Sequence, residues 1–276
     1  MATVTLASGL LGPGMATATE MAVPPQTGPA AQADFSSYLA AMPGKAFVVG
    51  PGGAWAWQSG QVSGEAALGL ALAACNAQAQ IKCVPYAVDD RRVFDEGAWA
   101  KAWGPYLSRR DAADRPVGLM RGARFPDIEF VDAKGKQRAL AQFRGRAVVL
   151  HFWGSWCAPC RHELPDMARF AKAMAGHEIA FLPLQVRESY ADSQRWLARE
   201  QIALTVFDSG MRSADDGEFR VRGGGRLPDR AVAPVFPSTV FLDRHGVIVF
   251  VHHGPIARWE DYRPQLLNLL AGQRKR

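Results

Sequence analysis

The 276-residue sequence lacks long apolar stretches and runs of basic residues, and it contains only four cysteines. No apolar run approaches the roughly 18 residues of a membrane span, so no transmembrane segment is predicted. The net charge of +6 is spread along the chain. This disfavours nucleic-acid binding, because that activity is normally marked by clustered Lys and Arg. A hydrophobic content of 48% is typical of a globular chain with a substantial core.

Lys and Arg are also absent from the first 44 residues. A short apolar stretch ends in Ala16-Thr17-Ala18, a small-residue pattern typical of a signal-peptidase site, but the basic region that should precede it is missing. Two interpretations stay open for residues 1–33, a secretory signal with its true start upstream or a disordered tail. Within that segment, residues 22–33 have the composition of a linker.

Two modules are predicted after this segment. Residues 34–117 form a small α+β unit with a hairpin around Pro51-Gly52-Gly53, a helix after Ser63, a strand from Cys83 and a second amphipathic helix over residues 95–110. Residues 118–276 alternate strands and helices and end in a hairpin and a helix, including a predicted strand over residues 204–208. This pattern predicts an α/β fold with a mixed sheet flanked by helices.

Two cysteines three residues apart lie in "HFWGSWCAPCRHELPDM", between an apolar strand and a helix. Cys157 is thus expected at the helix N-terminus, where backbone N–H groups stabilise a thiolate, and Cys160 one turn later on the same face. Pro159 suits the first helical turn, where its missing N–H costs nothing. The pattern predicts a nucleophile, Cys157, and a resolving thiol, Cys160, that close a disulfide between them.

Other uses of such a pair fit less well. Structural zinc needs four ligands, and there is no second C-x-x-C. Haem attachment needs C-x-x-C-H, but Arg161 stands where the histidine is required. A structural disulfide in so tight a ring would stabilise the fold poorly. Neither a metal nor another cofactor is expected.

With these motifs, residues 122–274 resemble the thioredoxin superfamily, most closely its TlpA/ResA-like branch of periplasmic thiol–disulfide oxidoreductases. The resemblance is carried by "VVLHFWGSWCAPCRHELPDM" and, about 80 residues later, "FPSTVFLDRHGVIVFVHHGPI". It implies a thioredoxin-like fold in which Pro237 is a cis-proline facing the cysteines. It also implies that Trp156, Phe236 and Pro237 contact substrate, with His151 and Pro159 in supporting roles.

Several residues depart from the family pattern or fall outside it. His151 stands where thioredoxins keep a buried acid, so it is either a proton relay or a hydrogen-bonded core histidine. The segment over residues 220–235 is longer than usual and carries four arginines, which fits either a mobile basic flap or a solvated loop. Ala158 and Pro159 between the cysteines differ from the common inner pairs, so the redox direction does not carry over. Glu163 is expected to be a solvated helix residue rather than a proton shuttle.

Cys75 and Cys83 are separated by a polar turn between the predicted helix and strand of the first module. Such a return can bring two thiols within disulfide reach, although two reduced core cysteines remain the alternative. A disulfide here would favour an oxidising compartment such as the periplasm over the cytoplasm.

The predicted function is a thiol–disulfide oxidoreductase acting on protein disulfides, with reduction as the expected direction and a membrane thiol electron donor as the expected partner. One alternative is a binding or holdase module on a thioredoxin fold. Another is a thiol peroxidase, but Leu150 and Gly154 occupy the Pro and Thr/Ser positions of the P-x-x-x-T/S-x-x-C pattern.

Overall fold

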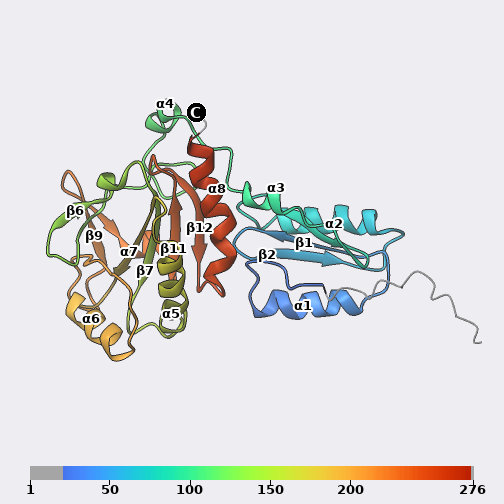
Figure 1. Cartoon of the computed structure of the whole chain (residues 1–276), viewed down its shortest axis with the longest axis horizontal. Coiled ribbons are helices and arrows are strands. Elements are labelled where there is room, and N and C mark those ends of the chain that lie inside the picture. The colour runs from blue at the N-terminus through green and yellow to red at the C-terminus, as the bar shows by residue number, and fades with distance from the viewer. Residues whose placement is uncertain (1–20, 275–276) are drawn as a thin grey trace, which may run out of the picture.

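A computed structural model of the chain describes residues 21–274 and contains two separate four-stranded sheets (Figure 1). The candidate cleavage pattern at Ala16-Thr17-Ala18 lies outside these described residues. Among the helices that are described, none has the length and apolar character needed to cross a membrane.

The N-terminal sheet has the strand order β2-β1-β3-β4. Its strands are β1 (Ala46–Gly50), β2 (Ala54–Gln58), β3 (Val84–Val88) and β4 (Arg91–Arg92), and helices α1 (Pro29–Ala40) and α2 (Gly64–Asn76) cover its opposite faces (Figure 1). Successive side chains of a strand point to opposite faces. Phe47 therefore packs against Phe35 and Tyr38 of α1, and its neighbour Val48 packs with Ala71 of α2.

A disulfide joins Cys75, at the end of α2, to Cys83, just before β3, with a Cα–Cα distance of 6.1 Å. Both residues are buried. Closing so short a loop stabilises the folded chain by about 2–3 kcal/mol in the chain-entropy description.

The linker predicted over residues 22–33 is wrong. Gln26 and Thr27 are only 6% and 2% exposed, and α1 begins at Pro29, where proline suits the first turn. The side chain of Gln26 donates to Gln265, which is 239 residues away. The Ala- and Pro-rich composition alone suggested a linker. The contacts that hold this segment could not be read from it, because Asp261 and Gln265, which bond to Gln26, lie at the other end of the chain.

The single amphipathic helix predicted over residues 95–110 is also wrong. The structure has two short helices, α3 (Glu96–Ala100) and α4 (Arg109–Ala113), with a cis Gly104–Pro105 bond between them. Proline disfavours a helical conformation in the residue before it and donates no backbone hydrogen bond. The break lets Trp99 and Trp103 enter different cores.

The C-terminal sheet has the order β12-β11-β7-β8. Its strands are β7 (Ala147–Trp153), β8 (Ile179–Gln185), β11 (Ser238–Leu242) and β12 (Ile248–His253). β7 pairs parallel with β8 and antiparallel with β11. Every residue of β7 is buried, as predicted for a strand covered on both faces.

Different structures cover the two faces of this sheet. Val149 and Trp153 of β7 pack in a core formed with helices α5 (Ala158–Ala173), α6 (Tyr190–Arg199), α8 (Arg263–Arg274) and the short helix η2 (Trp259–Tyr262). Leu150 and Phe152 face a core formed with the hairpin of β5 (Glu129–Val131) and β6 (Gln137–Ala139), the short helix η1 (Leu140–Phe143) and the segment over residues 211–233.

The segment over residues 209–235, called the insertion below, has secondary structure of its own. Residues 204–208 make only isolated bridges instead of the predicted strand. After them, β9 (Glu218–Val221) and β10 (Gly225–Pro228) form a hairpin, and helix α7 (Asp229–Val232) leads to Phe236. The arginine-rich residues 220–235 therefore have regular secondary structure, and their mobility stays a prediction.

Candidate active site

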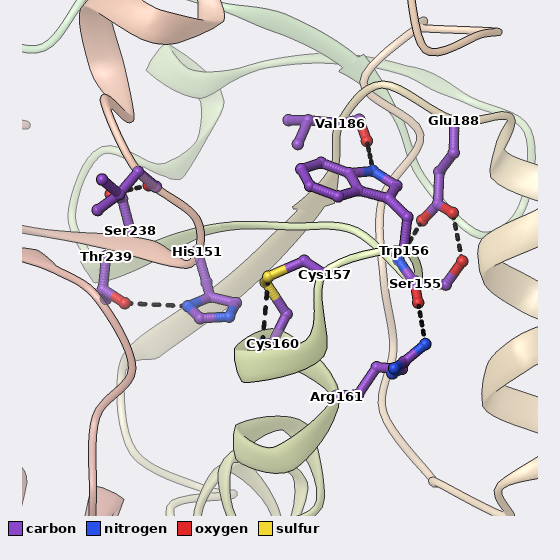
Figure 2. The surroundings of a disulfide bond; sticks show 11 residues. His151, Ser155, Trp156, Cys157, Cys160, Arg161, Val186, Glu188, Ser238 and Thr239 are labelled. Atoms are coloured by element: carbon purple, nitrogen blue, oxygen red, sulfur yellow. Dashed lines mark hydrogen bonds between the residues drawn. A yellow bond between two sulfur atoms is a disulfide. The ribbon is translucent and has the colours of Figure 1, made fainter.

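The two cysteines of the C-x-x-C motif form a disulfide at the start of α5, with a Cα–Cα distance of 5.2 Å (Figure 2). Cys157 caps the 16-residue helix, and its Sγ accepts the backbone N–H of Cys160 at 3.2 Å. Cys157 is 5% exposed, whereas Cys160 is fully buried. Pro159 lies in the first turn. The positive helix end and this N–H group favour the thiolate of Cys157, which is the reactive form of a cysteine.

Trp156, immediately before Cys157, is 45% exposed. Its ring stands edge-on to Phe236 with 5.6 Å between ring centroids, and its Nε1 donates to the carbonyl of Val186 at 3.0 Å. A Cβ at Gly154 would lie 2.3 Å from that Nε1, so any larger residue here would displace the indole. The indole thus presents a fixed, exposed apolar face beside the disulfide.

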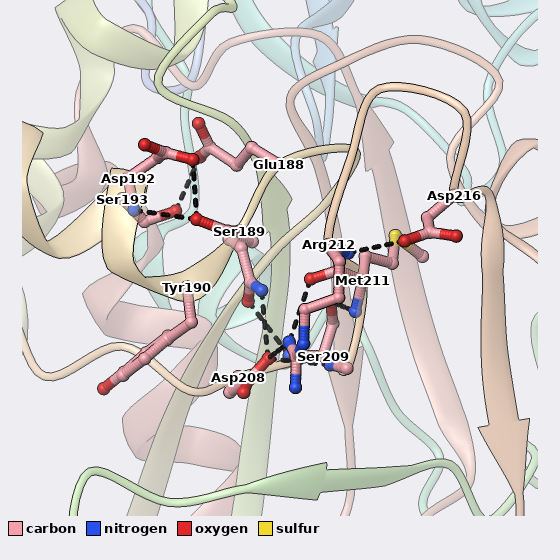
Figure 3. Close-up of polar contacts among 12 residues, drawn as sticks. Glu188, Ser189, Tyr190, Asp192, Ser193, Asp208, Ser209, Met211, Arg212 and Asp216 are labelled. Carbon is pink, nitrogen blue, oxygen red and sulfur yellow. Dashed lines mark hydrogen bonds and ion pairs between the residues drawn. The ribbon is translucent and has the colours of Figure 1, made fainter.

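The loop before Cys157 is fixed by a carboxylate that sequence reasoning missed. Glu188, which follows β8 and is 8% exposed, accepts the backbone N–H of Ser155 at 2.8 Å and the hydroxyl of Ser193 at 2.6 Å (Figures 2 and 3). The Ser155 hydroxyl also donates to it. The available signal was its place after β8, since residues that follow neighbouring parallel strands lie at the same sheet edge.

The Phe236–Pro237 peptide bond is cis and leads into β11. Ser238 at the start of β11 pairs with Phe152 near the end of β7, and Cys157 follows that same end. The Arg230 guanidinium of α7 lies over the Phe236 ring, 4.7 Å from its centroid. The structure therefore brings Trp156, Phe236 and Pro237 to the sheet edge that carries the cysteines, with one arginine of the insertion beside them.

His151 is fully buried, and its Nδ1 is 2.9 Å from Thr239 Oγ1. Its ring is edge-on to Trp259, and among the described residues its Nε2 has no hydrogen-bond partner. Burial, with a smaller contribution from nearby His252, lowers the pKa of His151 to about 3. Of the two interpretations left open, these contacts favour the core histidine, held neutral.

Glu163 was expected to face solvent, and this expectation is wrong. It is 4% exposed, and desolvation raises the pKa of its carboxyl to about 8, against a smaller opposing effect of the nearby Ile256 backbone and Trp259. Among the described residues, neither of its carboxyl oxygens has a hydrogen-bond partner. It lines a cavity of about 460 Å³ with Pro159 and His162. The sequence carried the signal: Glu163 follows Cys160 by three residues, and Leu164 and Met167 share that face, so Glu163 belongs to the buried stripe.

A larger cavity of about 720 Å³ opens beside Trp156, between α6 and the insertion. Arginines are prominent in its lining, but most are paired. Arg187 makes two hydrogen bonds to Asp229, at 2.6 and 3.0 Å. Arg212 contacts Asp208 at 2.8 Å (Figure 3). The insertion is thus tied to the loop after β8 by the Arg187–Asp229 ion pair.

Part of the chain is similar to several known proteins. A model of the AhpC/TSA family matches residues 121–251. The thioredoxin-like protein YneN of Bacillus subtilis is 26% identical over 160 residues, which is 53% of this chain and 79% of YneN. The thiol-disulfide oxidoreductase ResA of Geobacillus kaustophilus is 32% identical over 137 residues, 50% of this chain and 71% of ResA. A crystal structure of a thioredoxin-family thiol:disulfide interchange protein from Chlorobium tepidum covers 55% of this chain and 99% of its own, with 24% identity and a TM-score of 0.40.

The fold and its relatives define a thiol–disulfide oxidoreductase with a thioredoxin-like domain. Within that class, the chain belongs to the TlpA/ResA-like family.

Proposed function

We propose that Cys157 and Cys160 are the redox pair of this oxidoreductase and that they reduce disulfides in protein substrates. The observation that carries the proposal is the disulfide at the N-terminus of α5, where Cys157 Sγ accepts the N–H of Cys160. The difference in burial supports the division of roles, because the partly accessible Cys157 can meet a substrate and the enclosed Cys160 cannot.

In the reduced protein, the Cys157 thiolate attacks one sulfur of a client disulfide, forming a mixed disulfide and releasing the other client sulfur as a thiolate. The Cys160 thiolate then attacks Cys157 Sγ, which releases the second client thiol. Two electrons pass to the client, and the Cys157–Cys160 disulfide seen here is the product. The exposed Trp156 face and the Phe236–Pro237 backbone provide the adjacent surface on which a client segment would lie.

The assignment predicts that the protein accelerates the reduction of insulin by dithiothreitol and that Cys157→Ser abolishes the acceleration. The double variant Cys75→Ser, Cys83→Ser is the control, and it should keep the activity because that disulfide lies in the N-terminal module. Full activity in Cys157→Ser would contradict the proposal and favour a holdase.

Replacing Cys160 with Ala should trap substrates, since the mixed disulfide on Cys157 would no longer be resolved. The adducts should disappear on reduction and be absent from the Cys157→Ser, Cys160→Ala double variant. Identical behaviour of the two variants would mean that Cys157 does not meet protein disulfides.

The direction, donor and compartment belong to the same proposal. A reductase must be recharged, and we propose a membrane thiol donor and a periplasmic or otherwise exported location, supported by the Cys75–Cys83 disulfide, which suits an oxidising compartment. A Cys157–Cys160 reduction potential near that of thioredoxin, about −270 mV, would support reduction; one above about −180 mV would indicate an oxidase or isomerase.

We also propose a division into two domains with the boundary between residues 117 and 118. The first domain starts before residue 34, because α1 begins at Pro29. Two separate four-stranded sheets support the division, although Trp103 packs in the core of the C-terminal sheet.

A further inference from the structure

Arginine side chains from distant parts of the sequence converge on a third cavity, of about 550 Å³. It is lined by Arg109 of α4, Arg124, Arg144 before β7, and Arg244 with His245 in the turn between β11 and β12. No carboxylate is among its lining residues.

This cavity lies at the end of the C-terminal sheet opposite to the cysteines. Arg144 precedes the first residue of β7, and Cys157 follows the last. The seven residues of β7 span about 23 Å at roughly 3.3 Å per residue. A ligand in this cavity would therefore not compete with a substrate at Cys157.

Within the described part of the chain, the four arginines of this cavity make no direct ion pair with a neighbouring acid. The carboxylates of Asp127 and Asp243 attract Arg144 from a longer distance. Their direct contacts are with backbone N–H groups, that of Ala141 for Asp127 and those of His245 and Val247 for Asp243. The arginines beside Trp156, in contrast, are mostly paired.

The directions of the pKa shifts agree with the placement of these groups in one cavity. Burial lowers the pKa of Arg144, and the Arg124 charge lowers it further, although Asp127 and Asp243 oppose the shift. Burial also lowers the pKa of His245, and Arg244, Arg144 and Arg109 act in the same direction against Asp243. The cavity thus holds four like charges and a neutral imidazole, an arrangement that an anion would stabilise.

We propose that this cavity binds a phosphate group, carried either by a soluble phosphorylated molecule or by a phospholipid headgroup. Guanidinium groups donate paired hydrogen bonds that match phosphate oxygens, and four of them from four segments can surround a tetrahedral oxyanion. A single carboxylate has two oxygens in one plane and satisfies fewer of these donors. If the source is a headgroup, the membrane lies at the end of the sheet away from Cys157.

The test measures binding to the full chain by calorimetry with inorganic pyrophosphate, and by co-sedimentation with vesicles of phosphatidylcholine containing phosphatidylglycerol. The variant is Arg144→Gln, Arg244→Gln. The control, Arg169→Gln, Arg220→Gln, removes the same charge from exposed positions elsewhere. Insulin reduction and the melting temperature are recorded for each protein, to separate a binding defect from a folding defect.

We expect the wild type and the control to bind, and the Arg144/Arg244 variant to bind at least tenfold more weakly while keeping its melting temperature and insulin reduction. Binding of pyrophosphate identifies a soluble phosphate site, and binding of the anionic vesicles alone identifies a headgroup site. Absence of wild-type binding to both probes would overturn the proposal, and so would equal weakening in the variant and its control.

Discussion

At the scale of single residues, two buried ionisable groups lie near Trp259. The His151 ring stands edge-on to it, and the Glu163 carboxyl lies near it without a hydrogen bond. Burial holds both side chains neutral, with opposite pKa shifts. The two groups therefore make stability depend on pH in opposite directions.

Glu163→Gln should remove the loss of stability that the wild type shows as the pH rises from about 4.5 to about 8. The folded carboxyl, with a pKa of about 8, holds a proton that the unfolded chain releases near 4.5. The free energy of unfolding of the wild type therefore falls as pH rises from about 4.5 to about 8, and then levels off. Each pKa unit is worth about 1.4 kcal/mol, so the fall is on the order of a few kcal/mol. Urea midpoints at pH 5 and 8 measure it. The control is Glu178→Gln, at an exposed position, which should lose as much stability as the wild type. An equal loss of stability between pH 5 and 8 in the wild type and Glu163→Gln would contradict the raised pKa of Glu163.

His151→Asn should act on the acid side. The folded imidazole has a pKa of about 3, compared with 6.5 for the ordinary group, so the unfolded chain binds a proton that the folded one does not. Wild-type stability is therefore full above about pH 6.5 and falls as the pH drops towards 3. The variant should lose less stability than the wild type between pH 6.5 and 4 in urea titrations. The control His177→Asn, at an exposed position, should lose as much stability as the wild type. An equal loss in His151→Asn, the control and the wild type would refute the prediction.

Single residues were predictable where their chemistry depends on local sequence. Cys157 and Cys160 could be found because a strand, a C-x-x-C motif and a helix are contiguous in the chain. Glu188 could not be found in this way, because its bond to Ser155 joins residues 33 positions apart. Glu163 was accessible from helical periodicity, but its charge was given more weight than its position in the buried stripe.

At the scale of elements, one ion pair adds to the hydrophobic packing that holds β9, β10 and α7 in place. Asp229 is 1% exposed and holds Arg187, which is 29% exposed, through two hydrogen bonds. Asp229 also accepts the backbone N–H of Ala233 through its carbonyl, which closes α7. The position of Arg230 over Phe236 therefore depends on this anchor.

Asp229→Asn should lower the free energy of unfolding by about 1–3 kcal/mol. This is less than the 3–5 typical when a fully buried pair is broken, since solvent screens Arg187. KM for insulin should rise more than kcat falls, because the change displaces the surface beside Phe236 and leaves the cysteines in place. Arg226→Gln breaks the exposed pair with Glu218 and should stay within about 0.5 kcal/mol. Equal effects of the two variants would show that the Arg187–Asp229 pair does not anchor the insertion.

The sequence predicted elements well where one periodicity ran without interruption, as in β7 and α5. It failed over residues 95–110, where Trp99, Trp103 and Leu107 keep helical spacing but Pro105 breaks the backbone. It also failed over residues 204–208, where an alternating apolar pattern lacks a full-length neighbouring strand.

At the scale of the whole molecule, Gln26 connects the two sheets. Its backbone N–H donates to Asp261 at 2.7 Å, its side chain donates to Gln265 at 3.1 Å, and its Oε1 accepts the N–H of Gly52 at 2.8 Å. Gln265 in turn donates to the carbonyl of Trp99. One buried amide thus bonds to helix α8 and to the turn between β1 and β2.

Gln26→Ala should weaken the coupling between the two sheets. In this variant the Gly52 N–H and the Gln265 side chain lose a hydrogen-bond partner away from solvent. The free energy of unfolding should fall by about 1–3 kcal/mol. Calorimetry should show one unfolding transition for the wild type and a lower, broadened or split transition for Gln26→Ala. Gln61→Ala removes a bond within the N-terminal module only and should melt as the wild type does. A single transition at the wild-type temperature in Gln26→Ala would contradict the prediction.

Trp103 determines whether the two domains of this chain can exist apart. It is 1% exposed and lies 4.7 Å from Phe241 and 5.8 Å from Phe250 between ring centroids, within the core of the C-terminal sheet, although the two-domain division assigns it to the first domain. A domain whose core contains a large side chain from a neighbouring domain does not fold well alone. Without that side chain its core keeps a cavity that the surrounding side chains do not fill. The two parts must therefore be inherited together, and recombination at residue 118 would yield a thioredoxin-like domain with a defective interior.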